Sequence, residues 1–82
     1  MQASEIESLI KEGLPGAQQV TVRGDDSVHF EATVVSEAFN GKSLLQQHRL
    51  VYATLGRRLN NEEIHALALK TYTPTTWQQK QS

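Results

Sequence analysis

Three histidines, His29, His48 and His65, are the residues of this 82-residue chain best suited to metal binding or proton transfer. Cysteine is absent, which excludes disulfides, thiol catalysis and thiolate ligands made by this chain alone. The histidines lie too far apart in the sequence for the close ligand pairs of a zinc site. Any thiolate ligand for a soft metal must therefore come from another molecule.

The chain contains no complete catalytic motif of the kinds considered below. The run Gly41-Lys42-Ser43 ends like a phosphate-binding loop, but it lacks the glycine that such a loop has five residues upstream. A hydrolase would need a nucleophile, a base and an orienting acid around a closed pocket, and so small a domain has little room for one. We therefore expect a protein that is not an enzyme and that docks onto another macromolecule.

Basic residues are concentrated in one part of the chain, although the net charge is only -1. No acidic residue occurs between Glu37 and Glu62, and the basic residues of that interval are Lys42, Arg49, Arg57 and Arg58. A positive region on an otherwise acidic body indicates a surface for a partner. The alternative is that these residues are only a solvated helix surface.

Composition is that of one folded domain covering residues 1–82, with 38% hydrophobic and 21% charged residues. No apolar run approaches the roughly 18 residues needed to span a membrane. The N-terminus is polar and acidic, unlike a secretion signal. These features predict a cytoplasmic protein that does not contact the membrane.

Hydrophobic periodicity predicts the elements that position the histidines in the first half of the chain. Ile6 and Ile10 recur at helical spacing, and Ser4 with Glu7 has the spacing of a capping box, so we expect a helix over about 4–12. Alternating residues from Val20 and from Val28 then predict two antiparallel strands around a turn at 24–27. This alternation places His29 on the polar face of its strand.

The second half of the chain predicts a helix, a strand and a short last helix. Ser43 and Gln46 form a second capping box, and Gly56 can end the helix. The stripe expected to face the core, which gives His48 a structural role, is Leu44, Leu45, His48, Val51, Tyr52, Leu55 and Leu59. A strand is expected over 64–72, then a helix capped by Thr73 that contains Trp77, and a frayed tail over 78–82. The fold class is α+β, with the order α-β-β-α-β-α and helices on one face of a three-stranded sheet.

Three segments resemble the BolA family in order and spacing. They are Phe39-Asn40-Gly41-Lys42-Ser43, then His48-Arg49-Leu50-Val51-Tyr52, and then Ile64 to Pro74 with Trp77. The resemblance implies a fold related to class II KH domains. The loop from Gly24 to Phe30 is most similar to that of bacterial acid-stress members, which carry a histidine there.

The resemblance further implies a role in iron-sulfur cluster handling. A BolA-like protein pairs with a monothiol glutaredoxin, and the two bind a bridging [2Fe-2S] cluster with glutathione. The expected ligands here are His65 and His29, with His48 as a third contender. Cluster iron accepts imidazole in place of thiolate, which agrees with the missing cysteines. The isolated chain is expected to be a monomer without a cofactor, and a heterodimer with its partner.

Two features complicate this assignment. Strand alternation would turn His29 and His65 to opposite faces of the sheet, unless the third strand begins after His65 or bulges. Many relatives also have arginine immediately before the helix histidine, where this chain has Gln47. We expect this difference to remove one positive charge from the contact surface.

Two other functions remain open. The basic helix after the Phe39 to Ser43 turn is similar to a helix-turn-helix arrangement, and Lys42, Arg49, Arg57 and Arg58 could contact DNA phosphates in a transcription regulator. The Gly-x-x-Gly loop that RNA-binding KH domains use is absent, because Gly56-Arg57-Arg58-Leu59 lacks the second glycine. A plain adaptor that docks its basic surface onto an acidic protein, with no cluster, is the third alternative.

Overall fold

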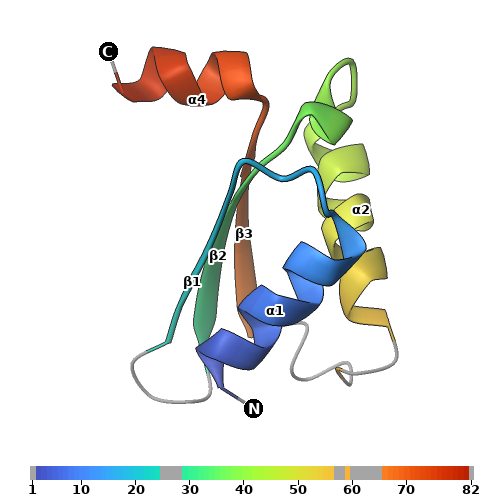
Figure 1. Ribbon diagram of the computed structural model, residues 1–82, viewed down its shortest axis with the longest axis vertical. Coiled ribbons are helices and arrows are strands. Elements are labelled where there is room, and N and C mark those ends of the chain that lie inside the picture. Colours follow the sequence, from blue (N-terminus) through green and yellow to red (C-terminus); the bar gives the residue numbers. More distant parts are fainter. Residues whose placement is uncertain (1, 25–28, 57–58, 60–65, 82) are drawn as a thin grey trace.

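A computed structural model describes residues 2–24, 29–56, 59 and 66–81. Among these residues the elements follow the order α-β-β-α-β-α that the sequence predicts, with one added 3-10 turn (Figure 1). They are α1 (Ala3–Gly13), β1 (Gln19–Arg23), β2 (Phe30–Val35), η1 (Glu37–Phe39), α2 (Leu44–Leu55), β3 (Leu67–Tyr72) and α4 (Pro74–Gln81).

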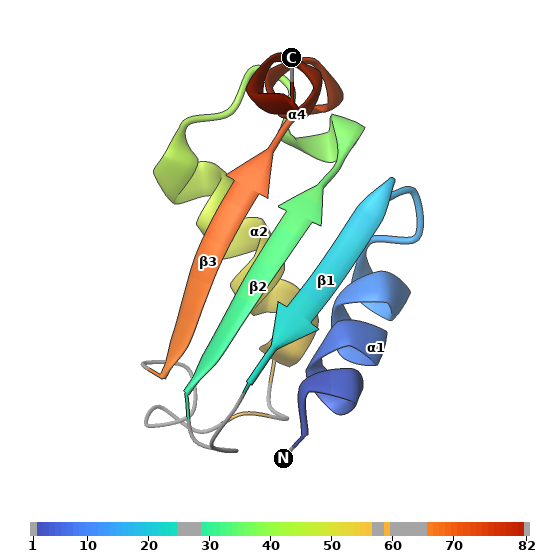
Figure 2. The same cartoon turned by 90° about the vertical axis from the view of Figure 1, so that its left-hand side faces the viewer.

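Within the described residues the three strands form one sheet in the order β1-β2-β3 (Figure 2). The pair β1 and β2 is antiparallel, which confirms the expected hairpin, with Arg23 opposite Glu31. In contrast, β3 is parallel to β2, with Phe30 opposite Leu67. Parallel neighbours need a long crossover connection, and α2 lies within that connection.

The hydrophobic core lies between one face of the sheet and the helices α1 and α2 (Figure 1). Ala32 and Val34 point into it from β2, and Ile6 and Ile10 point into it from α1, with at most 1% of each residue exposed. Alternation along the strand and helical spacing along α1 therefore place the expected residues inside. The two helices also approach closely at Gly13, where an added Cβ would lie 2.5 Å from Thr54 Cβ.

The buried side of α2 differs from the predicted stripe. Gln47, Val51 and Leu55 are buried, whereas Leu44 and Leu45 are 64% and 59% exposed. The prediction for these two leucines was wrong because the stripe that contacts the sheet begins at Gln47 and continues every fourth residue. The polar Gln47 side chain can be buried because both ends of its amide are hydrogen-bonded. Its nitrogen donates to the Lys42 carbonyl at 2.9 Å, and its oxygen accepts from the Thr71 hydroxyl at 2.7 Å.

The observed ends of α2 agree with those predicted from the sequence, whereas the start of α1 differs from its prediction. The Ser43 N–H donates to Gln46 Oε1 at 2.9 Å, the Gln46 N–H donates to Ser43 Oγ at 3.2 Å, and Gly56 follows α2 with a φ of 49°. In α1 the predicted cap at Ser4 was wrong. The Gln2 N–H donates to Glu5 Oε1 at 3.2 Å, so the helix begins earlier and continues to Gly13.

Helix α4 lies apart from α1 and α2, at the end of the sheet where β3 finishes (Figure 1). The Thr76 N–H donates to Thr73 Oγ1 at 3.1 Å, which confirms the predicted cap. The expectation of helices on one face of the sheet holds for α1 and α2. The helix runs to Gln81, so residues 78–81 are helical and the frayed tail predicted from Gln78 was wrong there. A tilted aromatic contact with Tyr72, with ring centroids 5.1 Å apart, attaches Trp77 to β3.

Candidate ligand site at the strand ends

His29 lies immediately before β2 and is exposed. The next residue, Phe30, is buried, and its N–H donates to the Ala66 carbonyl at 2.9 Å. Because β2 and β3 are parallel, their N-terminal ends lie side by side, and this hydrogen bond joins them just before the ladder begins. The exposure of His29 agrees with the prediction that this residue lies on the polar face of its strand.

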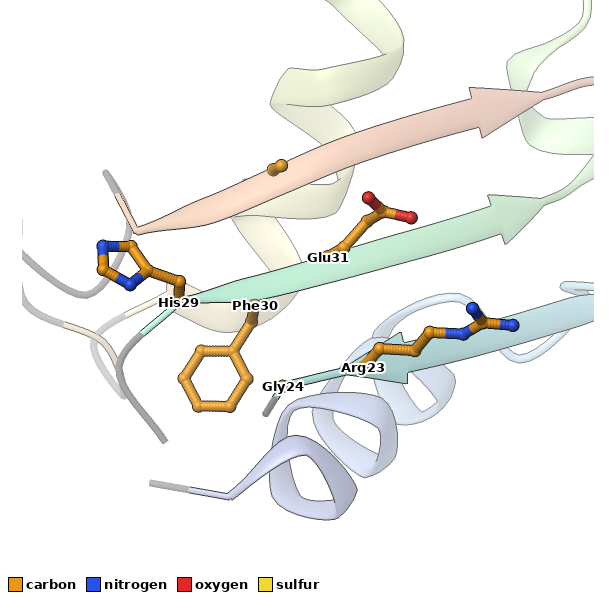
Figure 3. A pocket seen from close by; sticks show the side chains of 6 residues that line it. Arg23, Gly24, His29, Phe30 and Glu31 are labelled. Atoms are coloured by element: carbon orange, nitrogen blue, oxygen red, sulfur yellow. The ribbon is translucent and has the colours of Figure 1, made fainter. Parts of the chain in front are cut away.

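A shallow hollow of about 420 Å³ borders His29 (Figure 3). Its lining residues are Arg23, Gly24, His29, Phe30, Glu31 and Ala68. The His29 and Phe30 side chains leave the backbone in different directions (Figure 3). The imidazole therefore stays at the end of β2, whereas the phenyl ring is buried in the core. Gly24 makes room for that ring, because a Cβ on Gly24 would lie 2.4 Å from Phe30 Cδ1.

Charges of both signs surround the hollow. Glu31 Oε1 lies 3.4 Å from Lys70 Nζ, and both side chains are about half exposed. Arg23 is the cross-strand neighbour of Glu31. Sequence reasoning did not select Arg23, Gly24 or Glu31, although the register of a hairpin would place Arg23 opposite Glu31. The hollow beside His29 is therefore lined by side chains of both charges together with apolar residues.

His65, Arg57 and Arg58 lie outside the described residues, and so does Ile64, the predicted start of the third strand. The described strand β3 begins at Leu67. The expectation that His29 and His65 face apart therefore also lies outside the described residues. Within the described residues, no three His, Cys, Asp or Glu side chains form a group that could hold a metal ion.

His48, Lys42 and Arg49 occupy α2 and the residues just before it. His48 was expected on the buried stripe of the helix, but it is only half-buried, because it lies beside the Gln47, Val51 and Leu55 stripe and not within it. Lys42 and Arg49 are exposed as expected, and with Gln46 and Leu50 they line a second hollow of about 210 Å³. Gln47, which stands where many relatives are expected to have arginine, is buried in this chain.

The fold and this site define a small α+β domain that presents an exposed histidine at the joined ends of two parallel strands. Residues 8–76 match the model of the BolA-like protein family, and the chain belongs to that family. This confirms the resemblance seen in the sequence.

Individual relatives agree with this assignment. The chain is 38% identical over 77 residues to the acid stress protein IbaG of Escherichia coli K12, covering 94% of this chain and 89% of that protein. This agrees with the expected acid-stress subgroup. It is 54% identical over 57 residues to the DNA-binding transcriptional regulator BolA of Vibrio cholerae, covering 70% of this chain and 52% of the regulator. The solved structure of a BolA protein homologue from Coxiella burnetii superposes with a TM-score of 0.81 at 40% identity, covering 95% and 97% of the two chains.

The helices that the structure describes include none with the length and apolar character needed to cross a membrane.

Proposed function

We propose that this chain is the BolA-like partner of a monothiol glutaredoxin and that the two share a bridging [2Fe-2S] cluster with glutathione. His65 and His29 are the proposed ligands from this chain. The observation that carries the proposal is the hydrogen bond from the Phe30 N–H to the Ala66 carbonyl at 2.9 Å. Phe30 follows His29 in the sequence and Ala66 follows His65, so the bond joins the two residues that come directly after the proposed ligands.

The donor chemistry fits a shared site. The chain has histidine but no cysteine, and imidazole can replace thiolate on one iron of a [2Fe-2S] cluster. His29 is exposed, so a second protein that brings thiolates can reach it. The role of this chain would be to supply imidazole and to orient it through the fixed backbone of β2. The partner and glutathione would supply the sulfur ligands.

Anaerobic reconstitution of the full chain with a monothiol glutaredoxin and glutathione tests this proposal. Visible absorption and circular dichroism would be compared for wild type, His65→Ala and His29→Ala. We expect a wild-type spectrum that differs from that of the glutaredoxin homodimer and that is lost in His65→Ala. A wild-type mixture that gives only the homodimer spectrum would reject the cluster role.

His48→Ala is the matched control, because His48 is half-buried on α2 and away from the strand ends. We expect it to leave the mixed spectrum unchanged. Loss of the spectrum in His48→Ala with retention in His29→Ala would make His48 the second ligand. Circular-dichroism melts of each variant separate ligand loss from unfolding, since a ligand variant should keep the wild-type melting temperature.

DNA binding is the second candidate function. It is favoured by the exposure of Lys42 and Arg49 beside one hollow and by the name of the Vibrio cholerae relative. Each phosphate contact contributes about 0.9 to the slope of log affinity against log salt. If both residues contact phosphates, Lys42→Gln with Arg49→Gln should lower that slope by about 1.8 in fluorescence anisotropy with duplex DNA. An unchanged slope would place any phosphate contacts elsewhere.

A further inference from the structure

The first turn of α2 carries two leucines that the core of this chain does not cover, and two partly exposed rings follow them along the helix. Leu44 and Leu45 are 64% and 59% exposed, and His48 and Tyr52 are half-buried. In these four residues, here called the α2 stripe, Leu44 and Leu45 precede His48 by four and three residues, and Tyr52 follows it by four, so each of the other three is a neighbour of His48 on the helix surface. The adjoining face of the helix is buried through Gln47, Val51 and Leu55.

Positive charge borders the α2 stripe. Arg49 is four residues after Leu45 and therefore its neighbour on the helix, and Lys42 precedes the helix by two residues. Lys42 and Arg49 line the hollow of about 210 Å³ with Gln46 and Leu50. α2 contains no acidic residue, and none occurs between Glu37 and Glu62. The surface thus combines two exposed leucines with two basic residues on a segment that carries no acidic residue.

We propose that the α2 stripe is a docking surface for an acidic amphipathic segment of a partner protein. Aliphatic side chains of the segment would cover Leu44 and Leu45, and its carboxylates would meet Lys42 and Arg49. Charge complementarity selects this occupant. Nucleic acid would meet the two basic residues, but its phosphate backbone offers no apolar cover for the leucines. A membrane is disfavoured because two leucines form a small apolar area and the chain as a whole is slightly acidic, with a net charge of -1.

This surface is separate from the proposed ligand site and does not depend on the cluster role. α2 begins near the end of the sheet where β2 and β3 finish, whereas His29 lies where β2 starts (Figure 2). One partner at each end could therefore bind at the same time.

The test uses the full chain labelled with ¹⁵N and a synthetic amphipathic helix of about 18 residues, long enough to cover two turns of α2. The peptide carries leucines on one side and glutamates on the flanks. We expect it to shift amide signals from Lys42 to Tyr52 and to leave those of β1 unchanged. A matched peptide with lysine in place of every glutamate should bind about tenfold more weakly or worse. Equal binding of both peptides, or shifts that map to other elements, would overturn the proposal.

Variants identify the surface without disturbing the fold. Leu44→Gln with Leu45→Gln should weaken binding of the acidic peptide by about tenfold or more, because apolar burial is lost. Its melting temperature should stay at the wild-type value, since both leucines are largely exposed. Ala53→Gln is the control: Ala53 is exposed on the same helix and outside the α2 stripe. Equal loss of binding in this control would refute the assignment.

A second copy of the chain is the competing occupant. Sedimentation velocity over a range of concentrations should show a monomer that the leucine variant leaves unchanged. A dimer that dissociates in Leu44→Gln with Leu45→Gln would assign the surface to self-association and overturn the proposal of an acidic partner.

Discussion

Gln47 and Thr71 form a buried hydrogen bond between α2 and β3, with Thr71 Oγ1 donating to Gln47 Oε1 at 2.7 Å. The other end of the Gln47 amide donates to the Lys42 carbonyl at 2.9 Å. One side chain therefore holds the first turn of α2 against both the sheet and the preceding turn. Because Leu44, Leu45 and Arg49 share this part of α2, the bond also determines which residues the helix leaves at the surface.

Loss of this bond should be costly unless both partners are changed. We expect Gln47→Leu to lower the free energy of unfolding by about 1–3 kcal/mol, because it leaves the buried Thr71 hydroxyl without its acceptor. Adding Thr71→Val should recover part of the loss, since it removes the unpaired hydroxyl, whereas the Lys42 carbonyl stays without its side-chain donor. Urea unfolding of both single variants and the double variant measures this. Strictly additive losses would mean that the hydrogen bond is not the source of the effect.

The contact between α1 and α2 depends on glycine at position 13. An added Cβ would lie 2.5 Å from both Thr54 Cβ and Thr54 Cγ2, so Gly13→Ala should cost about 1–3 kcal/mol through overpacking. Gly16→Ala is the matched control, because nothing lies within 4 Å of a Cβ there. It should change stability little or raise it by a few tenths of a kcal/mol through the unfolded state, at most about 1 kcal/mol. Similar melting temperatures for the two variants would contradict the close helix contact.

Trp77 is the only tryptophan of the chain, so its fluorescence reports on α4 alone. Its ring lies 5.1 Å from that of Tyr72, tilted by 55°, and Lys80 Nζ lies 5.4 Å from the Tyr72 centroid. We expect Tyr72→Ala to shift the tryptophan emission to longer wavelength, because Trp77 loses its contact with the Tyr72 ring and becomes more exposed to water. Trp77→Ala should lower stability by about 1–2 kcal/mol, less than loss of a fully buried aromatic residue. An unchanged melting temperature for Trp77→Ala would place α4 outside the cooperative unit.

His29 and Phe30 are adjacent but should respond oppositely to substitution. His29 is exposed, so His29→Ala should change the free energy of unfolding by less than about 1 kcal/mol. Phe30 is 9% exposed and belongs to the core, so Phe30→Ala should cost about 3–5 kcal/mol. Chemical denaturation of the two variants gives the comparison. A large loss in His29→Ala would indicate a structural role for this histidine and weaken its assignment as a ligand.

Local sequence determined most of the secondary structure of this protein. The alternation of Val20 and Val22 requires a half-buried strand, and the reciprocal caps of Ser43 with Gln46 satisfy backbone groups within a few residues of themselves. Strand alternation and helix caps depend only on residues close together in the chain, so they can be predicted from the sequence. The exposed position of His29 follows from the same alternation.

Tertiary structure decided which side of α2 is buried and what surrounds His29. The helix offers apolar residues over a wide arc, and hydropathy alone favours Leu44 and Leu45 over Gln47. Gln47 is buried because Thr71, far away in the sequence, supplies a hydroxyl that satisfies its amide. Likewise, only the parallel pairing of β2 with β3 joins Phe30 to Ala66 and thereby the residues that follow His29 and His65. Both outcomes depend on partners that a local pattern does not contain.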